Sequence, residues 1–347
     1  MEEILNKFPF KGAIESVVEN TIGLINNTYV VTSEYEKYIL QRINKDIFKN
    51  PEELMENINL TTNYLNDLGK KTLSLIKDKE GALYTTCQGE HWRAFKYIES
   101  KSFKKVENIK IVAESAKELA NFHKHLISFP IHTLNNTIPD FHNTLVIFKK
   151  FQDICLNCPE SLTNQSIQEI NYILSKEEDC EIIYKLLVKN KLPLRVCHND
   201  PKVSNFLFDH SLNAICLIDL DTLMPGTLLT DISDAIRTIC VSETEDESDL
   251  KRLHFKCDYF EEFIKTYLDE NKMNLNYYEL NNIVKSIELI FLEQGIRFLT
   301  DYLNGNKYFK VSYRDQNLVR AKNQIYLSKE VVKNNNYLEG IVKQYAR

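Results

Sequence analysis

The chain lacks long hydrophobic runs and blocks of basic residues, and these two absences remove whole classes of protein. No apolar stretch approaches the roughly 20 residues that a membrane-spanning helix needs. Met1-Glu2-Glu3-Ile4 carries acids where a signal peptide needs positive charge. The 43 Lys and Arg residues are fewer than the 49 Asp and Glu residues, so the net charge is −6, and the basic footprint that nucleic acids require is missing. We therefore expect a cytoplasmic protein that binds neither membranes nor nucleic acids.

The sequence also lacks a cysteine pattern that would indicate disulfides or zinc. Eight cysteines are spread over 347 residues, and the cytosol keeps such thiols reduced. Cys155 and Cys158 form the only close pair, whereas a zinc site needs a second pair at suitable spacing. His123 and His125 could suggest a metal site, but no acidic or cysteine partner follows nearby. Incidental thiols and structural histidines are therefore the favoured interpretation.

What the sequence does contain is a group of polar residues at fixed spacing between apolar runs. His198-x-Asp200-x-x-x-x-Asn205 follows the apolar run 192–197, and Asp219 ends the apolar run 215–218. A kinase catalytic loop and its metal-binding aspartate have this arrangement. The alternative is a chance polar loop between two core strands. The order of strand, loop, hairpin and aspartate favours phosphoryl transfer.

Each residue of this group has a type that suits one part of the reaction. Asp200 can accept the proton of an attacking hydroxyl, because a carboxylate stays ionised at neutral pH. Asn205 and Asp219 offer the oxygen ligands that Mg²⁺ prefers. Lys202 could reach the transferring phosphoryl group, and the alternative is a solvated surface lysine. We expect His198 to orient the loop through hydrogen bonds rather than to transfer a proton.

The remaining pattern predicts two lobes. Residues 1–98 should form a strand-rich lobe around one helix that begins at Pro51, where a proline in the first turn is followed by acids. Residues 99–347 should form a mainly helical lobe that contains the catalytic loop, with a helix at 109–126. The fold class expected is α+β, with the first lobe clamping a nucleotide.

Glycine is scarce where a nucleotide-binding loop would need it. Only Gly23 precedes Asn26-Asn27-Thr28, whereas a protein kinase would have G-x-G-x-x-G. Backbone N–H groups and the small side chains of Asn27 and Thr28 could still hold phosphates.

The usual strand lysine is missing too. Strand alternation makes Arg42 the candidate cation for the phosphates, with Glu53 or Glu56 as its partner. An exposed strand arginine is the alternative.

Two later segments carry charged residues within apolar patterns. After residues 225–226, Asp231 suits a helix N-cap and Asp234 is expected to anchor the catalytic loop from beneath. Arg297 and Asp301 are four apart in the apolar segment 280–303, which suggests a surface ion pair. The alternative is that both line a substrate pocket.

Taken together, these motifs resemble the aminoglycoside phosphotransferase and choline kinase superfamily, and within it the N-acetylhexosamine 1-kinases. The stretches that carry the resemblance are residues 26–31, 38–44, 92–93, 198–205, 218–226, 297–303 and 308–309. The catalytic residues define the superfamily, and the last two stretches point to sugar kinases.

The resemblance implies a two-lobed protein-kinase-like fold and ATP- and Mg²⁺-dependent phosphorylation of the anomeric hydroxyl of GlcNAc or GalNAc. It implies Asp200 as the base, with Asn205 and Asp219 as metal ligands, and makes the backbone at Ile98 an adenine-binding hinge. The residues that it places toward the sugar are Asp221, Thr222, Arg297, Asp301 and Tyr308. A monomer would suffice for this reaction.

Two other functions stay open. One is a kinase of the same fold that acts on an amino alcohol, another sugar or an aminoglycoside. An aminoglycoside or choline site usually needs an acidic pocket that binds a cation, and the late acids Asp246, Glu247 and Asp249 lie on a segment expected to be a solvated loop. The other is a pseudokinase that binds a nucleotide or a protein without turnover. The presence of all the catalytic residues argues against it.

Overall fold

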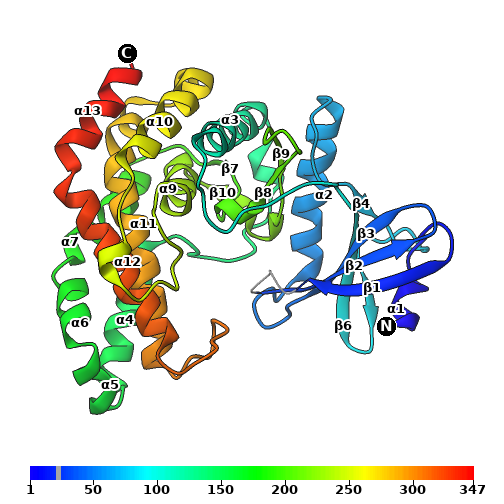
Figure 1. Ribbon diagram of the computed structural model, residues 1–347, viewed down its shortest axis with the longest axis horizontal. Coiled ribbons are helices and arrows are strands. Elements are labelled where there is room, and N and C mark those ends of the chain that lie inside the picture. The colour runs from blue at the N-terminus through cyan, green and yellow to red at the C-terminus, as the bar shows by residue number, and fades with distance from the viewer. Residues whose placement is uncertain (21–24) are drawn as a thin grey trace.

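The chain forms a lobe built on an antiparallel sheet and a larger, mainly helical lobe (Figure 1). This computed structural model describes residues 1–20 and 25–347. The strand-rich first lobe and the helical second lobe confirm the predicted α+β class. Gly23 lies outside the described residues.

The sheet of the first lobe has the strand order β1-β2-β3-β6-β4, with β5 paired to β6, and all its neighbours are antiparallel. Its elements are α1 (Glu2–Leu5), β1 (Ile14–Asn20), β2 (Asn27–Ser33), β3 (Lys37–Ile43), α2 (Pro51–Asp67), β4 (Leu75–Ile76), β5 (Thr85–Cys87) and β6 (Glu90–Lys96). Alternate residues of β3 face opposite sides. Tyr38 and Leu40 pack into a small cluster with α1, whereas Ile39 and Ile43 pack into the main core.

Helix α2 begins where the sequence predicts and ties the two lobes together. The side chain of Asn50 caps it by accepting a hydrogen bond from the Glu53 N–H at 3.3 Å, and Pro51 follows. Asn57, which is fully buried, donates from Nδ2 to the carbonyls of Asn135 (2.8 Å) and Leu223 (3.0 Å). Its Oδ1 accepts from the Asn135 N–H at 2.8 Å. The side-chain amide of one α2 residue therefore holds two separate segments of the second lobe.

In the second lobe, helices pack around two short pairs of strands. Its long helices are α3 (Ile109–His125), α4 (Thr144–Asn157), α9 (Leu228–Ile239), α10 (Cys257–Asn271), α11 (Tyr277–Leu303), α12 (Gln316–Lys333) and α13 (Asn335–Tyr345). The shorter ones are α5 (Glu160–Gln165), α6 (Ile167–Leu174), α7 (Glu177–Cys180) and α8 (Ile182–Val188). A second apolar cluster lies among α4, α6, α11 and α12. None of the helices in the described part of the chain has the length and apolar character needed to cross a bilayer.

Two small antiparallel pairs position the polar motif found in the sequence. Strand β7 (Arg195–Cys197) pairs with β10 (Met224–Gly226), and β8 (Phe206–Phe208) pairs with β9 (Ala214–Leu217). Lys101, which follows β6, exchanges two backbone hydrogen bonds with Phe208 at 2.8 and 2.9 Å. Figure 1 shows these two strand pairs between the helices of the second lobe and α2. The motif therefore lies where the two lobes meet.

Candidate active site

The loop after β7 brings three of the expected catalytic residues together. Lys202 Nζ lies 2.6 Å from Asp200 Oδ2, and Asn205 Nδ2 donates to the Asp200 carbonyl at 2.8 Å and to its Oδ2 at 3.3 Å. Burial opposes the charge of Lys202, but the carboxylates of Asp200 and Asp219 outweigh it and raise the Lys202 pKa above its ordinary value. Lys202 is therefore a charged partner of Asp200 rather than a solvated surface lysine.

The loop passes through an unusual backbone conformation at Asn199. Its φ of 62° lies in the left-handed region, which asparagine adopts more readily than most residues. The side chain stabilises this turn by donating from Nδ2 to the Thr222 carbonyl at 2.9 Å. Gly226 is needed opposite it, because a Cβ there would lie only 2.8 Å from Asn199 Oδ1.

Asp231 anchors the catalytic loop from beneath. Its carboxylate accepts hydrogen bonds from the backbone N–H groups of His198 and Asn199, both at 2.7 Å, and lies 2.9 Å from His123 Nε2. Burial favours its protonated form, yet His123, His198 and the backbone hydrogen bond hold the Asp231 pKa below its usual range.

The roles expected for Asp231 and Asp234 were therefore wrong. Helix α9 begins at Leu228 with Thr227 as its N-cap, so Asp231 already lies in the first turn and faces β7. Asp234 lies almost one turn further on and pairs with Arg237 at 2.7 Å.

Two buried histidines have structural partners. His198 Nε2 lies 2.9 Å from the Ile218 carbonyl, and its Nδ1 accepts from the Asp200 N–H at 3.3 Å. His123 lies between Asp231 and the Tyr267 hydroxyl, which is 2.8 Å from its Nδ1. His198 therefore joins the catalytic loop to the strand that delivers Asp219.

Asp219 and Asn205 present oxygens that could hold a metal. The Ile218 N–H donates to the Asn205 carbonyl at 2.9 Å, which brings the two segments side by side. Asn205 donates from Nδ2 to the Asp200 carbonyl, which leaves its side-chain oxygen available as a metal ligand. The Asp219 carboxylate has no hydrogen-bond donor within residues 1–20 and 25–347, and burial and the charge of Asp221 raise its pKa. One amide oxygen and one crowded carboxylate fit Mg²⁺, which takes few protein ligands and leaves the rest to substrate phosphates.

Asp221 has a different role from the one expected. Its Oδ1 lies 2.5 Å from Arg93 Nη2, and its Oδ2 accepts from Asn26 Nδ2 at 2.6 Å. Arg93 comes from β6, is only 1% exposed, and also donates from Nε to Gln41 Oε1 at 3.0 Å. Both oxygens of Asp221 are thus occupied in a buried pair between the lobes rather than free to bind a sugar.

Thr222, also expected near the sugar, donates its hydroxyl to the His198 carbonyl at 2.7 Å.

Arg93 rather than Arg42 is the arginine that faces the catalytic segments. Arg42 lies on the other face of the sheet, where it contacts Asn27 Oδ1 at 2.8 Å and Glu90 at 4.0 Å. The prediction that Glu53 or Glu56 is the partner of Arg42 was therefore wrong. Gln41 and Arg93 are paired in adjacent strands, so their side chains lie on the same face of the sheet. This inner face is the one from which Arg93 reaches Asp221 of the second lobe.

The residues expected to hold the nucleotide do not all lie on one face of the sheet. Thr28 Oγ1 accepts from Gln41 Nε2 at 3.0 Å and so lies on the inner side, whereas Asn27 lies with Arg42. Ile98 follows the end of β6 in the segment between the lobes, and its carbonyl accepts from the Ser100 hydroxyl at 2.9 Å.

Arg297 and Asp301 do not pair with each other. Arg297 lies 3.3 Å from Glu293 Oε1, donates to the Phe141 carbonyl and stacks on the Phe141 ring at 4.8 Å. Asp301, only 5% exposed, accepts from the N–H groups of residues 307–309 at 2.8 to 2.9 Å. The ion-pair hypothesis was wrong because Arg297 pairs with Glu293, whereas the Asp301 carboxylate accepts backbone N–H groups.

Asp301 shapes the loop that carries Tyr308. Burial and the negative charge of Asp200 raise the Tyr308 pKa, and Arg297 opposes them. The Tyr308 phenol, although 47% exposed as a residue, thus lies within electrostatic reach of both Asp200 and Arg297.

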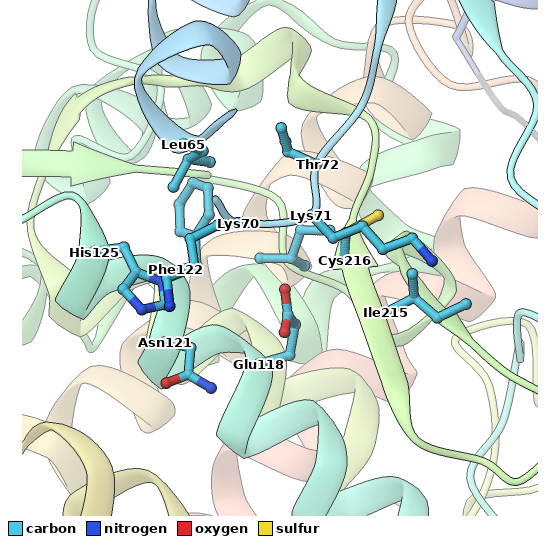
Figure 2. Close-up of a pocket in the computed structure, with 11 residues that line it drawn as sticks. Leu65, Lys70, Lys71, Thr72, Glu118, Asn121, Phe122, His125, Ile215 and Cys216 are labelled. Carbon is cyan, nitrogen blue, oxygen red and sulfur yellow. The ribbon is translucent and has the colours of Figure 1, made fainter. Parts of the chain in front are cut away.

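A cavity of about 210 Å³ lies elsewhere, between α3, the segment after α2 and β9 (Figure 2). Its lining includes Leu65, Lys71, Glu118 and Cys216, and none of the residues proposed for catalysis. Burial and the nearby Glu114 raise the Glu118 pKa to about 7. This cavity is separate from the candidate active site.

Comparison with known proteins bears on the family and the fold. Residues 16–263 match the sequence profile described as the Phosphotransferase enzyme family. An aminoglycoside phosphotransferase from Alicyclobacillus acidocaldarius is similar over 99% of this chain and 96% of its own, with a TM-score of 0.64 and 15% identity. Spectinomycin phosphotransferase is similar over 99% and 97%, with a TM-score of 0.60 and 16% identity. Choline kinase from Cryptosporidium parvum is similar over 100% and 99%, with a TM-score of 0.58 and 15% identity.

These structures share the fold, which confirms the predicted protein-kinase-like class. The profile match covers most of the chain, including the catalytic loop and Asp219. The chain therefore belongs to the phosphotransferase enzyme family.

Proposed function

We propose that the protein is a kinase that uses ATP and Mg²⁺ to phosphorylate the anomeric hydroxyl of an N-acetylhexosamine, GlcNAc or GalNAc, to the α-1-phosphate. One observation carries the kinase part: Asp200, Lys202 and Asn205 are hydrogen-bonded together, and the nearby Asp219 carboxylate accepts no hydrogen bond from the described residues. Nucleotide use is supported by the similar spectinomycin phosphotransferase, whose structures contain ADP and AMP.

In the proposed reaction, Asp200 accepts the proton of the acceptor hydroxyl while that oxygen attacks the γ-phosphorus. A new P–O bond forms, the bond from the γ-phosphorus to the bridging oxygen breaks, and ADP leaves with that electron pair. Lys202 supplies a fixed positive charge next to Asp200. Asn205 and Asp219 would hold Mg²⁺, which neutralises phosphate charge when bound. An anomeric hydroxyl is more acidic than an ordinary alcohol, so a carboxylate is a sufficient base.

The charges around the acceptor side favour a neutral, hydroxyl-rich substrate. A cationic acceptor such as choline would need free carboxylates, but those near Arg297 already have partners. Glu293 binds His142 and Thr144, and Asp301 binds three backbone N–H groups. The later acid Asp246 pairs with Arg320 at 2.7 Å. The Arg297 guanidinium has more N–H donors than it uses on Glu293 and Phe141, and Tyr308 is 47% exposed, so both groups suit sugar oxygens.

The test is ATP-to-ADP turnover with Mg²⁺ across GlcNAc, GalNAc, ManNAc, galactose, glucosamine, choline, homoserine and kanamycin. Phosphorus NMR should then identify a sugar 1-phosphate from an N-acetylhexosamine. Turnover only with an amine-bearing acceptor would keep the kinase and refute the sugar assignment. Nucleotide binding without turnover of any acceptor would support the pseudokinase alternative.

Replacing Asp200 tests the proposed base. Asp200→Asn should lower kcat by about 10²-fold to 10⁴-fold, the usual contribution of a general base, with ATP binding retained. Asp153→Asn, at an exposed position of α4, is the matched control and should leave kcat unchanged. Near-normal turnover by Asp200→Asn would contradict the assigned base.

A further inference from the structure

His142 is held through both ring nitrogens beside the catalytic loop. It lies just before α4, with a side chain that is 10% exposed. Its Nδ1 is 2.8 Å from Glu293 Oε1, and its Nε2 is 2.8 Å from the Asn199 carbonyl oxygen. A carbonyl oxygen can only accept a hydrogen bond, and so can an ionised carboxylate. If Glu293 is ionised, both nitrogens must carry hydrogen, and His142 is an imidazolium.

The surroundings of Glu293 favour its ionised form. Its side chain is only 2% exposed, and Oε2 accepts from the Thr144 hydroxyl at 2.7 Å. Arg297 Nε lies 3.3 Å from Oε1. Although burial favours protonation, His142 and Arg297 hold the Glu293 pKa below its usual range. Glu293 is therefore a buried anion between two cations.

The same contacts keep His142 charged. The charged groups that face it are Glu293 and Arg297, both from α11, and the ring of Phe141 packs edge-on at 4.5 Å. Burial and Arg297 lower its pKa, but Glu293 and the Asn199 carbonyl outweigh them, so the pKa of His142 is raised.

The carbonyl that His142 holds belongs to the residue before Asp200. Asn199 has its left-handed conformation fixed from three directions: its N–H by Asp231, its side chain by the Thr222 carbonyl, and its own carbonyl by His142. The peptide group between Asn199 and Asp200 is thus oriented by His142. A tilt of this peptide group would redirect the Asp200 side chain.

We propose that His142, as an imidazolium, is a positioning residue that fixes the peptide group before Asp200, so that turnover falls at alkaline pH when His142 loses its proton. This inference rests on the proposed role of Asp200. A neutral imidazole has one N–H for two partners that only accept, so one of the two hydrogen bonds must break. Folding raises the proton affinity of His142, so His142 fully positions the peptide group at low pH. This positioning is lost as pH rises through the raised pKa of His142.

The first test uses the unmodified protein labelled with ¹⁵N at histidine. Over a pH series, both ring nitrogens of His142 should keep the protonated signals of an imidazolium to a higher pH than those of the exposed His132. The backbone amide of Asp200, whose peptide group includes the Asn199 carbonyl, should shift as His142 titrates. Neutral-tautomer signals for His142 at a pH where His132 is still charged would overturn the inference. So would an Asp200 amide whose chemical shift does not change as His142 titrates. Neither result depends on which acceptor is phosphorylated, so a failure of the proposed substrate is distinguishable.

The second test compares pH profiles of kcat for the acceptor that is turned over. His142→Gln should lower kcat by about 10-fold to 100-fold, as for other groups that orient a reactive residue, and should lose the alkaline fall. Glu293→Gln removes the anion but keeps an accepting oxygen, so the alkaline fall should move to lower pH. His132→Gln, at an exposed site, is the control and should match the unmodified protein. An unchanged alkaline fall in both His142→Gln and Glu293→Gln would refute the role of His142.

Discussion

Replacing Asp231 tests whether this buried carboxylate contributes more stability than an exposed aspartate in the first turn of a helix. Asp231 is fully buried and accepts two backbone N–H groups in addition to its contact with His123. In Asp231→Asn one oxygen becomes an NH₂ group, which cannot accept, so one buried N–H of the catalytic loop loses its partner. Hydrogen bonds to charged groups contribute about 1.5–3 kcal/mol, and an unsatisfied buried donor costs about 1–3 kcal/mol. We expect the variant to lose about 2–5 kcal/mol of the free energy of unfolding.

Thermal unfolding and kcat measure this effect. A loss of that size should lower Tm by roughly 3–7 °C in a chain of this length and should lower kcat as well. Asp258→Asn is the matched control, because Asp258 is also an aspartate in the first turn of a helix but is exposed. It should cost less than about 1 kcal/mol. Equal losses in the two variants would refute the anchoring role.

The pH dependence follows from the depressed pKa of Asp231. A lowered carboxyl pKa contributes stability above the unfolded value of about 4, and this contribution is lost as pH falls through the folded value. The Tm difference between Asp231→Asn and the unmodified protein should therefore shrink in acid.

Two further predictions concern the boundary between the lobes and the separate cavity. Arg93→Met should cost about 3–5 kcal/mol, since it leaves Asp221 buried without its cation; adding Asp221→Leu should restore part of the Tm, and no restoration would contradict the pairing. Glu118, whose pKa burial raises to about 7, should destabilise the fold as pH rises from about 4 through that value. Glu118→Gln should therefore be the more stable protein at pH 8 and lose that advantage near pH 4; parallel Tm curves would show that the carboxyl is not buried.

The sequence was sufficient where neighbouring residues determine the structure. The start of α2 follows from Asn50 and Pro51, and the spacing of Asp200 and Asn205 follows from one short loop. Contacts between remote segments could not be found this way. Asn26 and Asp221 bond across 195 positions, and His142 reaches Glu293 across 151. Asp231 and Asp234 have the same chemistry three residues apart, so only the start of α9 decides which one faces the loop.

The attachment of α2 through Asn57 bears on how activity can be controlled. In protein kinases the position of one helix in the first lobe, which carries half of an ion pair, controls whether the enzyme is active. Here a buried amide on α2 makes three hydrogen bonds with Asn135 and Leu223, so an outward swing would leave all of these groups unpaired within the core. The free energy of these three hydrogen bonds therefore opposes any movement of α2 relative to the segments that carry Asn135 and Leu223.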